Sequence, residues 1–283
     1  MHRPTLIATA LKNYTHVLNG PPWERVHKVE TAHYIVLTDI SKERAKFFAD
    51  HLEWIHSYYR RTFTVRSGRK ARALFFSTRE GYNQYAELTA NARVEWTAGV
   101  YYPDYDQLLV FEGKDSQYED DEYILQVVYH EGFHQFISRV VKDLPAWANE
   151  GMAEFYGIIT FDEFGTPSNQ GGIQHGRLYG LQQYLEKGGQ PLAFADLMTQ
   201  SLPEFQQGNV PLKYAQSWAM VHFFMTAPNG RRDLFLRYFR LLREGRSRWY
   251  AFHATYGQAN LGELEQAWLE HVGRLKAKRP KGM

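Results

Sequence analysis

The chain has 283 residues, of which 44% are hydrophobic and 23% charged, as in folded globular proteins and unlike disordered chains. Its 33 basic and 31 acidic side chains leave a net charge of +2, so charge gives no reason to expect nucleic acid as a partner. Cysteine is absent, which excludes disulfides, thiolate metal ligands and a cysteine nucleophile. No apolar run reaches the 18 or so residues of a membrane span.

The first segment, residues 1–30, is predicted to be irregular, with Gly20, Pro21 and Pro22 as breakers. Its apolar stretch ends at Lys12, too early for a normal signal peptide. We therefore expect either a cytoplasmic protein or the mature form of an exported one.

A mixed α/β lobe is predicted over residues 31–157. Four short runs rich in β-formers predict strands, and four segments with apolar residues at helical spacing predict helices. The strands are expected at 33–37, 71–77, 97–102 and 107–112, and the helices at 42–62, 79–88, 120–141 and 145–157. Ser41 is the expected N-cap of the first helix. The turn residues at 103–106 predict a hairpin, and 114–121 a polar loop.

The remaining residues, 158–283, are predicted to form a helical C-terminal lobe. Residues 161–176 contain four glycines and a proline and are expected to form a loop. Helices are expected near 176–187, 192–200, 211–226, 230–244 and 261–277. The predicted fold class is therefore α+β.

The central predicted helix carries the sequence His130-Glu131-Gly132-Phe133-His134. Histidines at i and i+4 share one helical face, so both imidazoles can reach one metal ion. Glu131 lies about 100° around the helix, where it can reach a metal-bound water without being a ligand. The pattern predicts a zinc hydrolase site. The alternative is a pair of core histidines with satisfied hydrogen bonds.

A third ligand is expected from the next predicted helix. Glu150 and Glu154 are again one turn apart, among apolar neighbours that indicate burial. Folding this face back onto the histidines would let Glu150 ligate the metal and Glu154 accept the free ring N–H of a ligand histidine. The alternative is two solvated carboxylates on a surface helix.

These segments together resemble the gluzincins, the thermolysin-like zinc-peptidase superfamily, and especially a bacterial peptidase-MA-like family. The resemblance implies a thermolysin-like zincin fold with a mixed α/β lobe, a central active-site helix and a helical lobe, and one Zn²⁺ per chain held by His130, His134 and Glu150. The segment from Asn149 to Ala153 is similar to that of gluzincin aminopeptidases, whose glutamate is the third zinc ligand. The thermolysin branch implies the orienting role for Glu154.

A further resemblance lies in Lys213–Val221, which is similar to a segment that opens a C-terminal helix in this superfamily. It implies that Tyr214 stabilises the oxyanion of the tetrahedral intermediate. The sequence departs from the aminopeptidases before the central helix, where their Gly-x-Met-Glu-Asn segment is replaced by 97–102. This departure favours an endopeptidase over an aminopeptidase.

The predicted strand at 97–102 is expected, by the same resemblance, to pair with extended substrate through Gly99, Val100 and Tyr101; an ordinary hairpin strand is the alternative. His175, in a glycine-rich loop, is a weaker substrate-binding candidate, as is Arg177 beside it, and His222 is expected to be a core histidine.

The predicted function is hydrolysis of peptide bonds by metal-activated water, with Glu131 as general base and a peptide or protein as substrate. Two alternatives remain: a zincin-fold binding module without turnover, and a hydrolase of a non-protein amide such as a cell-wall peptide.

Overall fold

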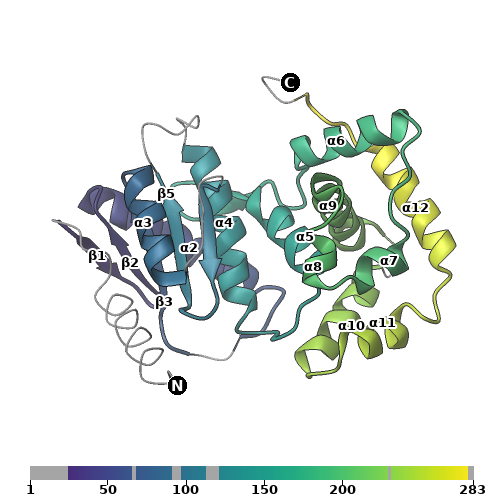
Figure 1. The fold of residues 1–283 in the computed structure, drawn as a ribbon, viewed down its shortest axis with the longest axis horizontal. Coiled ribbons are helices and arrows are strands. Elements are labelled where there is room, and N and C mark those ends of the chain that lie inside the picture. Colours follow the sequence, from purple (N-terminus) through teal and green to yellow (C-terminus); the bar gives the residue numbers. More distant parts are fainter. Residues whose placement is uncertain (1–24, 66–67, 91–96, 113–120, 229–230, 280–283) are drawn as a thin grey trace, which may run out of the picture. The chain divides into compact units, whose positions relative to one another are not determined.

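The computed structural model describes residues 25–65, 68–90, 97–112, 121–228 and 231–279. It is an α+β fold whose described residues divide into two compact units. Unit 1 runs to Phe136 and includes residues 163–165, and unit 2 comprises residues 137–162 and 166–283. Figure 1 shows strands and helices together in unit 1 and mainly helices in unit 2.

Unit 1 is built on a five-stranded sheet of order β1-β2-β3-β5-β4. Strands β2 (Tyr34–Thr38), β3 (Ala71–Phe76) and β5 (Gln107–Phe111) are parallel, while β1 (His27–Glu30) and β4 (Gly99–Tyr102) are antiparallel to their neighbours at the two edges. The hairpin predicted between the last two strands is confirmed, with Tyr102 opposite Gln107.

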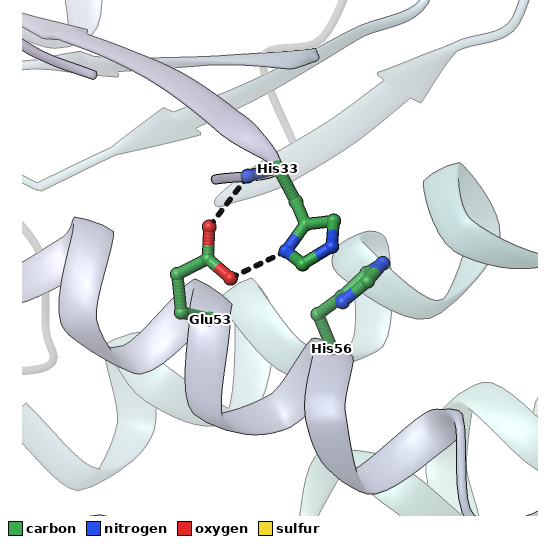
Figure 2. Close-up of side chains that lie close together, drawn as sticks. All are labelled: His33, Glu53 and His56. Carbon is green, nitrogen blue, oxygen red and sulfur yellow. Dashed lines mark hydrogen bonds and ion pairs between the residues drawn. The ribbon is translucent and has the colours of Figure 1, made fainter. Parts of the chain in front are cut away.

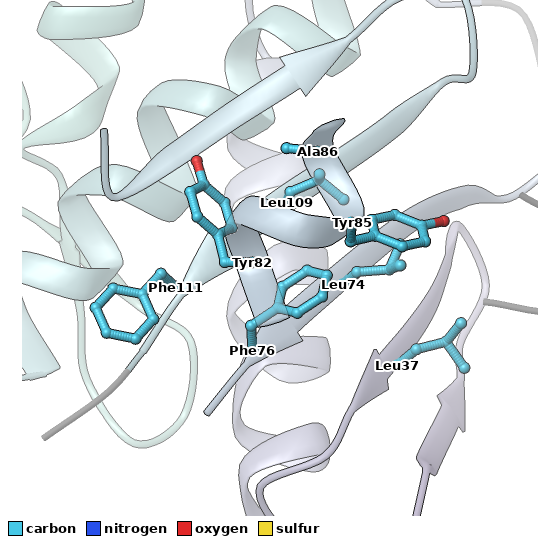
Figure 3. Packing of buried hydrophobic residues seen from close by; sticks show 8 residues of the cluster. All are labelled: Leu37, Leu74, Phe76, Tyr82, Tyr85, Ala86, Leu109 and Phe111. Carbon is cyan, nitrogen blue, oxygen red and sulfur yellow. The ribbon is translucent and has the colours of Figure 1, made fainter. Parts of the chain in front are cut away.

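Helices cover both faces of this sheet (Figure 1). Helix α3 (Arg79–Ala90) packs on one face, where Tyr82 and Tyr85 join a buried apolar cluster drawn in Figure 3. Side chains alternate along β3, so Leu74 belongs to that cluster while Phe75 stacks on Phe48 of α2 (Lys42–Tyr59), with ring centroids 3.7 Å apart. Burial of both faces explains why apolar residues stand at consecutive positions in the central strands, as in 73–76 and 108–111.

Helix α4 (Asp121–Ile137) packs beside α2 in the same unit. Tyr59 of α2 donates a hydrogen bond of 2.5 Å to the carbonyl of Tyr129, and its ring meets that of Phe133. At Gly132 a Cβ would lie 3.7 Å from Cδ2 of Leu52, an ordinary van der Waals distance, so α2 and α4 are in contact there. These contacts fix which face of α4 is turned away from α2.

Among its described residues, unit 2 is built of helices and loops together with the two-residue strands β6 (Thr160–Phe161) and β7 (Pro167–Ser168). Helix α5 (Ala146–Gly157) packs most extensively against α9 (Val210–Thr226). The other helices of this unit are α6 (His175–Glu186), α7 (Phe194–Thr199), α8 (Leu202–Phe205), α10 (Arg231–Arg243), α11 (Arg248–Thr255) and α12 (Leu261–Arg274). None of the helices in the described part of the chain is long and apolar enough to cross a membrane.

The structure corrects the predicted division of the chain. The lobes were expected to divide after residue 157, but α5 belongs to unit 2 because its contacts are with α9. The irregular segment 1–30 contains β1, which pairs with β2; residues 1–24 lie outside the described part. The central helix ends at Ile137, whose carbonyl accepts hydrogen bonds from both Val140 and Val141.

Smaller findings concern local elements. Helices α8 and α11 were not predicted, and the loop 161–176 contains part of the β6–β7 hairpin. The predicted polar loop 114–121 lies outside the described residues apart from Asp121. The cap at Ser41 is confirmed: its hydroxyl accepts from the backbone N–H of Arg44 at 3.1 Å.

Candidate metal centre

The two histidines of the central helix lie on one face of α4, as their spacing requires. Nε2 of His130 and Nε2 of His134 are 3.2 Å apart, and the two rings are nearly perpendicular, at 81°. Both residues are half-buried. The two nitrogens therefore converge on one point beside the helix, as a shared ligand requires.

This separation fits a zinc ion. Two nitrogens at 2.0–2.1 Å from a tetrahedral centre lie about 3.3 Å apart, which is close to the observed distance. Two imidazoles with a carboxylate form a donor set that zinc prefers. The pair thus has both the geometry and the chemistry to supply two of three protein ligands.

Strand β4 passes directly over the same helix. A methyl group at Gly99 would lie 2.5 Å from Cγ1 of Val127 and 3.1 Å from Cγ of Glu131. Glycine is therefore required at this position for the strand to approach α4 so closely. The result is that the first residue of β4 lies beside the side chain of Glu131, the predicted general base.

β4 is also the last strand at its edge of the described sheet, with β5 as its neighbour. Val100 and Tyr101 follow Gly99 along it and are half-buried. Val100 packs against the cluster under α3, and the hydroxyl of Tyr101 donates to Asp106 at 3.4 Å. The predicted substrate-binding strand thus lies at a sheet edge next to the central helix.

The two glutamates predicted to support the site lie on α5 in unit 2. Glu150 is half-buried and Glu154 is buried, with 6% of its surface exposed. Between them, Gly151 lies so close to α9 that an added methyl would be 2.5 Å from the carbonyl oxygen of Ser217. This contact fixes the position of both glutamates relative to α9.

Arg177 connects Glu154 to Tyr214 within unit 2. Its Nε and Nη2 atoms donate to Oε1 of Glu154 at 3.0 Å and 2.5 Å. The same guanidinium lies over the ring of Tyr214, 5.0 Å from the centroid. Tyr214 is half-buried in the first turns of α9. Arg177 thus contacts both Glu154, which is predicted to orient a ligand histidine, and Tyr214, which is predicted to stabilise the oxyanion.

Sequence reasoning identified Arg177 only as a possible substrate contact. The signal that could have linked it to Glu154 is burial of the carboxylate, since a buried charge needs a partner. That requirement does not say which of the many arginines supplies it. Only the packing of α6 against α9 selects Arg177.

The weaker histidine candidates occupy defined positions in unit 2. His175 is the first residue of α6, and its Nδ1 accepts the backbone N–H of Lys278 at 3.1 Å. Desolvation, and then the charge of Lys278, lower the pKa of His175. His222 is buried, as the sequence predicts, and bonds to His271 at 2.9 Å; burial, followed by His271, lowers its pKa to about 4.

Comparison with known families finds one similarity. A family described as "Protein of unknown function (DUF1570)" matches residues 124–245, less than half of the chain. The matched region begins within α4 and ends just after α10, so it includes the histidine pair, α5 and Tyr214. No curated protein matches the chain.

Proposed function

We propose that this protein is a zinc-dependent peptidase of the gluzincin type, with a thermolysin-like fold. The observation that carries the proposal is the convergence of Nε2 of His130 and Nε2 of His134 at 3.2 Å on the helix that also bears Glu131. Glu150 is proposed as the third ligand, on the strength of its sequence context. Bound zinc would supply a Lewis acid that lowers the pKa of its water and polarises the scissile carbonyl.

In this proposal Glu131 moves the proton. Its carboxylate accepts a proton from the attacking water and donates it to the amine that leaves when the peptide bond breaks. Tyr214 donates its hydroxyl proton in a hydrogen bond to the oxyanion of the tetrahedral intermediate. Arg177, through Glu154 and the Tyr214 ring, holds that phenol in place.

The proposed substrate contact is the edge strand β4. An extended peptide can add to a sheet edge through main-chain hydrogen bonds, which makes recognition independent of most side chains. Gly99, Val100 and Tyr101 would offer that backbone, and the approach of Gly99 to Glu131 supports cleavage of a strand bound there. His175 is a further proposed contact. This mode suits an endopeptidase, because the substrate chain continues past the cleaved bond.

The metal is tested first. Purified protein should bind one zinc per chain at this site, and His134→Ala and Glu150→Ala should each lower the zinc content by about one ion per chain. Glu122→Gln, on the exposed first turn of the same helix, is the control and should keep the metal. A parent protein that takes up no zinc when it is supplied would refute the proposal.

The mechanism is tested by Glu131→Gln on a peptide library. This variant should keep zinc and lose peptide cleavage by about 10²–10⁴-fold, because only the proton transfer is removed. Glu122→Gln should cleave normally. Unchanged cleavage by Glu131→Gln contradicts the assigned role. Cleavage confined to cell-wall amides would favour the non-protein hydrolase, and zinc binding without any cleavage would favour a binding module.

A further inference from the structure

A second histidine and carboxylate cluster lies in unit 1, formed by His33, Glu53 and His56 (Figure 2). His33 immediately precedes β2, and the other two residues lie one turn apart on α2. Each offers one potential ligand atom, and these three atoms lie within 4.8 Å of one another. The cluster shares no residue with the histidine pair of α4.

The carboxylate of Glu53 is held from two directions. Oε1 accepts the backbone N–H of His33 at 2.7 Å, and Oε2 bonds to Nδ1 of the same residue, also at 2.7 Å. Figure 2 shows one carboxylate oxygen joined to the backbone nitrogen of His33 and the other joined to its imidazole. Burial by itself would raise the pKa of Glu53, but hydrogen bonds from Thr31 and His33 outweigh it and lower this pKa.

His56 completes the cluster from the inner side. Its ring stacks on that of His33, with centroids 4.0 Å apart and planes 30° from parallel. His56 is buried, at 7% exposure, whereas the side chains of His33 and Glu53 are 38% and 22% exposed. The cluster is therefore anchored in the unit by His56 and exposed to solvent through the side chains of His33 and Glu53.

We propose that His33, Glu53 and His56 bind a divalent transition metal ion, with zinc as the expected ion. Glutamate and histidine at i and i+3 on one helix are a spacing that metal sites in helical proteins use. Two imidazoles and one carboxylate match zinc, and ligand distances of 2.0–2.2 Å require side-chain movements of about 1 Å from the observed positions.

The role of this ion is structural. It would tie the connection between β1 and β2 to α2, because His33 belongs to that connection and the other two ligands to the helix. The site holds no residue of the proposed catalytic set, so it goes beyond the proposed function and does not depend on it. We therefore expect it to affect the stability of unit 1 rather than the rate of cleavage.

The test uses the full chain with the first site removed by His130→Ala and His134→Ala together. After chelation and dialysis against micromolar zinc chloride, this double variant should retain about one zinc per chain. Adding Glu53→Gln, which keeps the size of the side chain, should weaken zinc binding at least tenfold. His253→Ala, an exposed histidine of α11, is the matched addition that should leave binding unchanged.

Two further readouts separate binding from folding. Zinc should raise the Tm of the double variant by a few degrees, as a ligand of the native state does, and should not do so once Glu53→Gln is added. Circular dichroism checks that each variant folds. A folded double variant that binds no zinc, or one whose binding survives Glu53→Gln, overturns the proposal. Either result leaves the His130–His134 site untouched.

Discussion

The close approach of α5 to α9 at Gly151 predicts a large effect from the smallest possible substitution. In Gly151→Ala the new methyl group would lie 2.5 Å from the carbonyl oxygen of Ser217, 2.7 Å from its carbonyl carbon and 2.9 Å from Cγ2 of Val221. Two of these atoms are backbone, and a Cβ has no rotamer by which to avoid them. The two helices must therefore separate by roughly 1 Å, given a normal carbon–carbon contact of about 3.5 Å.

The net effect is the difference between two terms. Replacing glycine by alanine inside a helix contributes about 1 kcal/mol of stability through helix propensity. Overpacking of a close-packed interface costs about 1–3 kcal/mol, and backbone contacts as short as these place Gly151→Ala at or above the upper end. The clash outweighs the propensity gain, so we expect the free energy of unfolding of unit 2 to fall by about 2 kcal/mol or more.

The measurement is urea or thermal unfolding, with Gly180→Ala as the control. Gly180 is exposed on α6, and a methyl group there meets nothing within 4 Å, so this change keeps the propensity gain without the clash. Gly180→Ala should raise stability by up to about 1 kcal/mol, while Gly151→Ala should lower Tm by several degrees. Equal shifts in the two variants would refute the inferred helix contact.

Three further predictions concern pH and packing. Burial lowers the pKa of His51 from 6.5 to about 4, so as pH falls the unfolded chain takes up this proton before the folded chain does. The free energy of unfolding should therefore fall by about 2 kcal/mol between about pH 6.5 and pH 5. In urea titrations, His51→Gln should reduce this dependence on pH. Arg177→Met removes the charged partner of the mostly buried Glu154 carboxylate and should lower the free energy of unfolding in urea by about 2–4 kcal/mol. Adding Glu154→Gln should recover part of this loss. If the effects of the two substitutions on stability simply add, the contact between Arg177 and Glu154 is contradicted. Phe48→Ala, which removes the ring stacked on Phe75, should cost about 3–5 kcal/mol, and a thermal shift below 2 °C would be inconsistent with that burial.

Much of the local structure follows from the sequence alone. The apolar repeat after Ser41 and the hydroxyl of that residue fix where α2 begins, and the turn residues at 103–106 fix the β4–β5 hairpin. The histidine pair is likewise a local property, because a helix places i and i+4 on one face whatever surrounds it. Its spacing is therefore the part of the candidate site that the sequence predicts best.

Other features depend on contacts between distant segments and carry no local signal. Strand β1 has an alternating pattern only four residues long and becomes recognisable once β2 pairs with it. Helix α5 belongs with α9 because Gly151 admits its backbone, a fact that spacing along the chain from α4 cannot reveal.

The charged clusters show the same limit. Glu154 needs a cation because it is buried, but only packing chooses Arg177. His33 is twenty residues from Glu53 in the chain, and the packing of α2 against β2 brings the two together. Residue type and helical period thus determined the elements and the histidine pair, because both act over a few residues. The tertiary structure alone decided the partners of the buried charges, because burial is a property of the whole fold.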